Sequence, residues 1–92
     1  MVSRPAVVLT PKPLGPANLL IWTVMITNAH RAEWPDDIHI PNAEKLGLVI
    51  PSKIRTTKIA AVTANSATLI GKLDRALWEE VRGRVRRHLG FR

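Results

Sequence analysis

The chain has 92 residues, of which 14 are Lys or Arg and 7 are Asp or Glu, so its formal net charge is +7, and it contains no cysteine. This composition excludes a disulfide framework and a thiolate zinc site, and 46% hydrophobic residues exclude a disordered chain. The length suits one domain with a modest core. No apolar run is long enough to cross a membrane and no signal-peptide pattern opens the chain, so we expect a cytoplasmic protein. The positive charge favours a polyanionic partner, either a nucleic acid or an acidic protein.

The first third of the chain contains two candidates for buried strands. Residues 6–9 (AVVL) are predicted to form the first strand. The prolines of residues 10–16 remove hydrogen-bond donors from a sheet, so that segment is predicted to be a loop. Residues 19–27 are almost all apolar and rich in β-branched side chains, which predicts a central strand buried on both faces, with Trp22 in the core. This strand ends at Thr27, where a rigid scaffold would hold the hydroxyl in place.

Shorter elements follow in the rest of the chain. The sequence predicts, in order, a polar loop over 28–37, a half-exposed strand over 37–41, a turn over 42–47, an apolar piece over 48–50, a long strand over 52–62, a turn over 63–67 and a short strand over 68–73. Because no helix separates these strands, the sheet should be mainly antiparallel. The pattern predicts a small, mainly β fold, as a curled sheet or barrel capped by one helix.

A change of period marks the C-terminal helix. Apolar residues recur every four positions at Leu77, Val81, Val85 and Leu89, which predicts an amphipathic helix over 75–89. Asp74 is a suitable N-cap and Gly90 a suitable residue just beyond the C-terminus. Trp78 should pack the helix against the sheet.

Two features of this helix need their own interpretation. Gly83 costs about 1 kcal/mol relative to alanine in a helix interior, which suggests close packing at that position. The second half is crowded with arginines: Arg82, Arg84, Arg86 and Arg87. These cations suit the negative end of the helix dipole, and direct contact with a nucleic acid is the alternative.

Most motifs of metal and nucleotide chemistry are absent from the sequence. It has no phosphate-binding glycine loop, no HExxH and no CxxC, and its histidines, His30, His39 and His88, share no ligand spacing. We therefore expect no metal and no cofactor. Asp36 and Asp37 are adjacent, and adjacent side chains on a strand point apart. They are interpreted as part of a solvated loop rather than a carboxylate pair.

Arginine and threonine side chains are the remaining candidates for chemistry. Arg4 precedes the first predicted strand, Thr27 ends the second, and Arg55 and Thr56 lie in the third long one. A guanidinium can bind two phosphate oxygens at once. A hydroxyl can donate to another oxygen as negative charge builds in the transition state. These residues are compatible with phosphate chemistry without specifying it.

An ordered set of short motifs resembles the MazF/PemK (Kid-like) toxins of type II toxin–antitoxin modules. The motifs are Arg4–Thr10, Ile26–Asn28, Gly47–Leu48, Pro51–Thr56 and Ile70–Leu73, followed by the C-terminal helix. They extend over almost the whole chain in the order of the family. The resemblance implies a single toxin domain over 1–92 with an SH3-like antiparallel β-barrel fold, which is usually homodimeric.

The same resemblance implies an activity and its partners. Members of the family are mostly metal-independent endoribonucleases that cut single-stranded mRNA at short motifs and so inhibit translation and growth. The 2′-hydroxyl attacks the adjacent phosphate and leaves a 2′,3′-cyclic phosphate. The implied partners are RNA, a cognate acidic antitoxin and a second copy of the chain, with operator DNA bound only through the antitoxin.

The resemblance also assigns roles to individual residues. Arg4 matches the family's catalytic arginine, and Thr27 matches its catalytic threonine. Asn28 replaces the serine that usually follows that threonine. Residues expected to bind RNA or support the site are Asn28, Trp34, Lys53, Arg55 and Thr56. Of these, Trp34 is the candidate for stacking on an RNA base.

Two departures from the family pattern leave alternatives open. Ser52 stands where some members carry a carboxylate, so the general base is not evident. The chain starts close to the Arg-Pro motif, and we expect an N-terminally shortened domain that lacks the family's first strand and loop. A catalytically inactive or truncated toxin-fold protein that acts by binding antitoxin, nucleic acid or another protein is therefore the main alternative. An unrelated basic SH3-like or OB-like nucleic-acid binder is a third, although its few aromatic residues do not favour it.

Overall fold

The computed structural model describes residues 4–90. Its regular elements are the strands β1 (Ala6–Val8), β2 (Leu20–Asn28), β3 (Asp37–His39) and β4 (Ser52–Thr63), the helix α1 (Arg75–His88), and three short 3₁₀ turns, η1 (Pro16–Asn18), η2 (Ala43–Leu46) and η3 (Ala64–Ser66). The helix therefore comes last, as predicted. In the described part of the chain, no helix has the length and apolar character that crossing a membrane requires.

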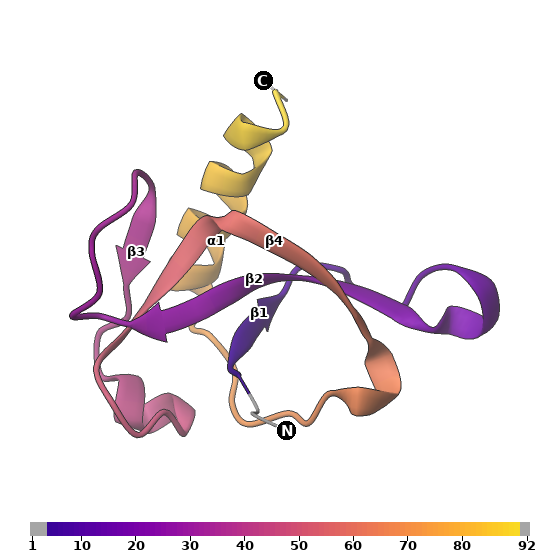
Figure 1. Ribbon diagram of the computed structural model, residues 1–92, viewed down its shortest axis with the longest axis horizontal. Helices are drawn as coiled ribbons and strands as arrows, with labels where there is room; N and C mark the ends of the chain where they lie inside the picture. The colour runs from indigo at the N-terminus through magenta and orange to yellow at the C-terminus, as the bar shows by residue number, and fades with distance from the viewer. Residues whose placement is uncertain (1–3, 91–92) are drawn as a thin grey trace.

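The strands form one curled antiparallel sheet in the order β1-β2-β4-β3 (Figure 1). Pairing between β2 and β4 is interrupted once: Val24 lies opposite Ile59, but the next residue, Met25, lies opposite Arg55. The three residues 56–58 of β4 are thus extra, and such a bulge bends a strand and increases its twist. The predicted mainly β fold, with an antiparallel sheet and a C-terminal helix, is confirmed.

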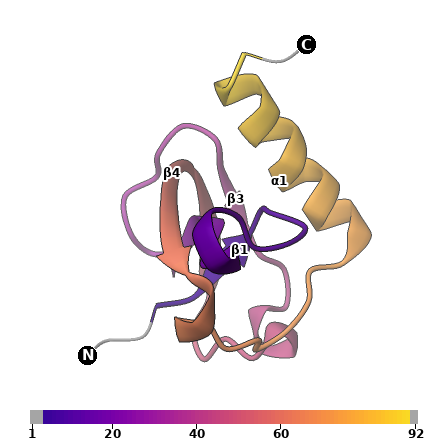
Figure 2. The same cartoon turned by 90° about the vertical axis from the view of Figure 1, so that its right-hand side faces the viewer.

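One face of the sheet packs against α1, which runs along that side in Figure 2. The buried core combines the sheet residues Val7, Val24, Ile38 and Ile54 with the helix residues Leu77, Val81 and Val85. The spacing of four along the helix places its three residues on one stripe. The helix begins at a cap, since Asp74 Oδ1 accepts a hydrogen bond from the Leu77 amide at 2.8 Å. Trp78 is partly buried against the core, as predicted.

Burial of the central strand on both faces was a wrong prediction. The side chain of Trp22 is not in the core but 50% exposed. The ends of β2 and β4 farthest from β3 extend beyond the helix, at the right of Figure 1. The helix that covers the core does not reach this arm, and several of its apolar side chains, namely Trp22, Ile59 and Val62, meet solvent, although Ile21 is buried. The strand itself was predicted correctly.

Two further predictions fail for reasons of packing. Residues 68–73 do not form a strand; they run against η2, so closely that a Cβ on Gly71 would lie 2.7 Å from the carbonyl oxygen of Leu46. The segment packs on η2 instead of pairing with a strand at the edge of the sheet. Gly83 does not mark close packing, because a Cβ there would meet nothing within 4 Å.

Candidate functional site

The end of β2 that carries Thr27 meets residues from both neighbouring strands. The Ile26 amide donates to the carbonyl of Pro5 at 3.1 Å, which continues the β1–β2 pairing toward the N-terminus. The next step of this antiparallel register brings Arg4 opposite Thr27. On the other side, Thr27 lies opposite Lys53 of β4. Because directly opposite side chains share a face of the sheet, the fold brings Arg4, Thr27 and Lys53 into one row.

The side chains at this end of β2 differ in how they are engaged. Thr27 is half-buried, and its hydroxyl has no hydrogen-bond partner within residues 4–90, where every fully buried side-chain polar atom is paired. Arg4 is exposed. Asn28 Oδ1 instead accepts a hydrogen bond from the His30 amide at 2.8 Å, which turns the chain away from β2. Arg4 and Thr27 are thus available to a ligand, whereas Asn28 shapes the following loop.

A loop over 29–36 folds over the polar face of β4 and is held there by Lys53. This side chain is 0% exposed. Its Nζ donates to the carbonyl oxygen of Arg31 at 2.6 Å and to Glu33 Oε1 at 2.8 Å, and Asp37 Oδ2 lies 3.5 Å away. A buried ammonium is costly unless it is paired and hydrogen-bonded. The loop supplies those partners, so Lys53 and the loop depend on each other.

Arg55 holds the second half of the same loop. Its guanidinium donates to both carboxylate oxygens of Asp37, at 3.3 and 3.1 Å, and to the carbonyl oxygen of Ala32 at 2.7 Å. The guanidinium carbon also lies 4.0 Å from the centre of the Trp34 ring, within the range of a cation–π contact. One face of the indole is therefore backed by a fixed cation, and the ring remains partly exposed.

Two carboxylates of this network have lowered pKa values. Burial raises the pKa of Asp37, but the hydrogen bonds from Arg55 and the Trp34 amide, with the charges of Arg55 and Lys53, outweigh burial and leave that pKa below its ordinary value. Hydrogen bonds from Lys53, and then from His39, lower the pKa of Glu33. Both groups are therefore ionised at neutral pH, as the two buried cations require.

Thr56 connects the loop to the C-terminal end of α1. Its hydroxyl donates to the carbonyl oxygen of Asp36 at 2.9 Å and lies 3.0 Å from His88 Nε2, from which it then accepts. The Asp36 carboxylate is 3.6 Å from Arg84 and 3.7 Å from Arg87. Those two helix arginines are therefore partly occupied by a contact within the protein.

The structure separates the predicted site residues into two groups. Arg4 and Thr27 reach solvent in one row, while Lys53, Arg55 and Thr56 lie buried beneath the loop and direct their polar groups to it. The prediction that Asp37 belongs to a solvated loop is wrong, because its side chain is 0% exposed.

Sequence reasoning missed the network around Asp37. A weak signal was available, since acidic Asp37 begins an alternation of polar and apolar residues in one predicted strand, and basic Arg55 follows apolar Ile54 in another. That pattern does not reveal which strands pair. In the structure, β3 pairs with β4 in a register that places Asp37 opposite Arg55. Within the described residues, no three His, Asp or Glu side chains gather closely enough to hold a metal ion.

Comparison with known proteins identifies the family. No individual curated protein matches the chain. Residues 2–89 match the family described as PemK-like, MazF-like toxins of type II toxin–antitoxin systems. This match covers nearly the whole domain and agrees with the curled antiparallel sheet and its single C-terminal helix. It therefore excludes the alternative of an unrelated nucleic-acid-binding fold. The chain belongs to the PemK-like, MazF-like toxins, the toxin component of type II toxin–antitoxin systems.

Proposed function

We propose that this toxin is a sequence-specific endoribonuclease that cuts single-stranded mRNA without a metal ion and thereby inhibits translation and growth. The observation that supports this most directly is the sheet register, in which an exposed Arg4 lies opposite Thr27, whose hydroxyl has no hydrogen-bond partner within residues 4–90. The 2′-hydroxyl of the RNA attacks the adjacent phosphorus, the P–O5′ bond breaks, and the products carry a 2′,3′-cyclic phosphate and a 5′-hydroxyl.

In this mechanism Arg4 and Thr27 are catalytic. The phosphorane-like transition state carries more negative charge than the diester, so a fixed guanidinium and a fixed hydroxyl stabilise it more than the ground state. Lys53, Arg55 and Thr56 act by fixing the loop that follows Thr27. Asn28 turns the chain into that loop, and Trp34, backed by Arg55, offers an open ring face to an RNA base.

The family implies a cognate antitoxin, and we propose that its acidic segment covers the row of Arg4 and Thr27. Attraction between this segment and a chain of net charge +7 weakens as salt screens it. Operator DNA is then bound only through the antitoxin.

We also propose a homodimer, which would bury apolar side chains such as Trp22 on the exposed arm. Sedimentation tests it: the wild type should sediment as a dimer and a Trp22→Ser variant as a monomer.

Cleavage of a long single-stranded RNA in the presence of EDTA, followed by analysis of the product ends, tests the activity. Arg4→Ala and Thr27→Ala should each lower the rate by about 10²–10³, the usual loss for one such donor, while the far-UV circular dichroism spectrum stays unchanged. Asn28→Ala should cost less. A requirement for Mg²⁺, or activity that survives both substitutions, would contradict the proposal.

Binding without catalysis is the second candidate function. The observation in its favour is Ser52, which is buried and donates to the carbonyl oxygen of Ile50 at 2.8 Å, so that no carboxylate acts as a base at that position. A wild-type protein that binds antitoxin but leaves RNA intact under all conditions would support this alternative.

A further inference from the structure

The loop over 29–36 returns to the sheet through a turn that contains a strained residue. The Asp37 amide donates to the carbonyl oxygen of Trp34 at 3.1 Å, which closes a β-turn. Pro35 fixes a negative φ at the second position and Asp36 has a φ of +68° at the third, a combination that defines a type II turn. Glycine is the usual residue at that third position, because it has no Cβ to resist a left-handed backbone. An aspartate there is costly.

The contacts of Asp36 tie this turn to α1. Its carbonyl oxygen accepts a hydrogen bond from the hydroxyl of the buried Thr56 at 2.9 Å. Its carboxylate lies 3.6 Å from Arg84 and 3.7 Å from Arg87. These two arginines are three positions apart, so they share one side of the helix. The turn is therefore connected to the end of α1 through the side chain of Asp36 as well as through its backbone.

Stability does not explain why an aspartate occupies this position. The side chain of Asp36 is 37% exposed and that of Arg87 is 68% exposed, and neither nitrogen–oxygen distance is short enough for a hydrogen bond. Such exposed ion pairs contribute little to stability. Arg84 also has a closer partner in Glu80, at 3.0 Å. Backbone strain that is not offset locally is a feature of functional sites, so the role of Asp36 lies in what the turn positions.

The turn positions the ring of Trp34, its first residue. The Trp34 amide donates to Asp37 Oδ2 at 3.0 Å, and the ring lies over the guanidinium of Arg55. Both of these contacts come from the strands below the ring. The path of the chain after Trp34 depends instead on the turn, so a change at Asp36 alters the angle at which the ring presents its open face.

The same geometry divides four arginines of α1 into two pairs. Arg84 and Arg87 lie near Asp36, whereas Arg82 lies 3.7 Å from Glu79. Arg86 forms no salt bridge within residues 4–90. An arginine that binds RNA directly acts through its own charge. An arginine that acts through Asp36 needs that carboxylate, so the two pairs have equal charge but different contacts.

We propose that Asp36 is a positioning residue for RNA binding, which joins the turn to Arg84 and Arg87 and so sets the open face of Trp34 for stacking on a base. The inference rests on the proposed function in taking single-stranded RNA as the ligand. Loss of the Asp36 carboxylate would tighten RNA binding if only charge mattered. Loss of the position of the ring weakens binding, so the two effects have opposite signs.

Fluorescence anisotropy with a labelled RNA of random sequence, about 12 nucleotides long and fully 2′-O-methylated, tests the proposal. This RNA lacks the attacking hydroxyl, so binding is measured without cleavage, and stacking on an aromatic ring tolerates any base. Trp34→Ala should bind about tenfold more weakly, a typical loss for one stacked base. Asp36→Gly should bind about fivefold more weakly, although its net charge is higher by one. Its unfolding temperature should be unchanged or raised, because glycine relieves the strain.

The second pair of arginines supplies a control of matched charge. Arg84→Gln, Arg87→Gln and Arg82→Gln, Arg86→Gln each remove two positive charges, but the first double variant should lose about fivefold more RNA affinity than the second. This excess should vanish in an Asp36→Gly background, because the contact through which Arg84 and Arg87 act is already absent.

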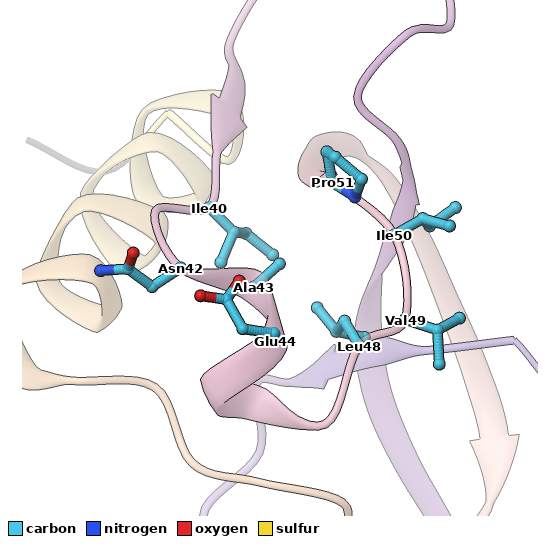
Figure 3. A pocket seen from close by; sticks show the side chains of 8 residues that line it. All are labelled: Ile40, Asn42, Ala43, Glu44, Leu48, Val49, Ile50 and Pro51. Atoms are coloured by element: carbon cyan, nitrogen blue, oxygen red, sulfur yellow. The ribbon is translucent and has the colours of Figure 1, made fainter.

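Asn42 supplies a control of matched backbone strain. Its φ is +54°, and it lies at the start of η2 without a side-chain capping hydrogen bond. Figure 3 shows it across a shallow pocket from Pro51. Asn42→Gly relieves a left-handed backbone just as Asp36→Gly does, but it should leave the RNA affinity unchanged.

Three results would overturn the proposal. Unchanged or tighter RNA binding by Asp36→Gly would show that the carboxylate does not position the ring. Equal losses in the two arginine double variants would assign both pairs to charge alone. Full additivity of Asp36→Gly and Trp34→Ala would show that Asp36 does not act through the ring. A wild type that binds the methylated RNA but leaves unmethylated RNA intact would remove the proposed cleavage alone.

Discussion

The two halves of β4 are opposites in composition and in burial. The first half, Ser52–Thr56, is mostly polar or charged, yet every residue in it is buried. The second half, over 57–63, includes Ile59 and Val62, and most of it is exposed. Residue type alone would suggest the reverse order.

The difference comes from what covers each half. The first half has the loop over 29–36 on its polar face, held by Lys53 and Arg55, and the core beneath α1 on the other face. The second half extends past the helix and is paired with β2 as an arm (Figure 1). Buried charges persist because partners satisfy them, and apolar side chains stay exposed where nothing packs on them.

Replacing Asp37, whose carboxylate pairs with both Lys53 and Arg55 under the buried half of β4, should have the largest effect on stability. Asp37→Asn leaves Lys53 and Arg55 buried with too little negative charge, and breaking a buried pair in this way typically costs 3–5 kcal/mol, so we expect a loss of about 3 kcal/mol in the free energy of unfolding. Urea denaturation followed by circular dichroism measures it. A loss below about 0.5 kcal/mol, the level of an ordinary surface substitution, would show that the network contributes little to stability.

Acid should weaken the same half of β4 without any mutation. The folded-state pKa values of Asp37 and Glu33 lie below their ordinary values, which are about 3.9 and 4.3. The resulting stabilisation is complete above those ordinary values and is lost as the pH falls through the folded-state values. The free energy of unfolding should therefore drop below about pH 4, and less steeply in Asp37→Asn; equal slopes for both proteins would contradict this assignment.

Gly71 and Gly83 test the same rule outside β4, namely that the atoms around a residue, rather than its type, decide what a substitution does to stability. Gly71→Ala places a Cβ 2.7 Å from the Leu46 carbonyl oxygen, and this overpacking should cost about 1–3 kcal/mol. Gly83→Ala meets open space within a helix and should stabilise the protein by about 1 kcal/mol. Thermal unfolding of both variants measures the difference, and a shift of the same sign in both would contradict it.

The smallest effect should come from the exposed half of β4. Ile59 is 46% exposed, so Ile59→Thr keeps a β-branched side chain and removes little buried surface. We expect a change in the free energy of unfolding within about 0.5 kcal/mol. A loss comparable to that of Asp37→Asn, measured by the same urea titration, would mean that the arm is covered in solution.

The sequence by itself was sufficient for features that depend on local pattern. The period of four from Leu77 to Val85, with Asp74 as cap, determined the helix, and the apolar β-branched run determined β2. The ordered motifs also pointed to the toxin family and to Arg4 and Thr27 as candidates, because such motifs can be compared position by position.

Only the tertiary structure decided which side chains are covered. It placed Asp37 between Lys53 and Arg55, left Trp22 half exposed, and laid residues 68–73 along η2 instead of on a sheet edge. Burial depends on contacts between segments far apart in the chain, and neither residue type nor periodicity records those contacts. Arg55 is therefore a buried anchor of the loop after Thr27 because the register of β3 with β4 brings Asp37 opposite it.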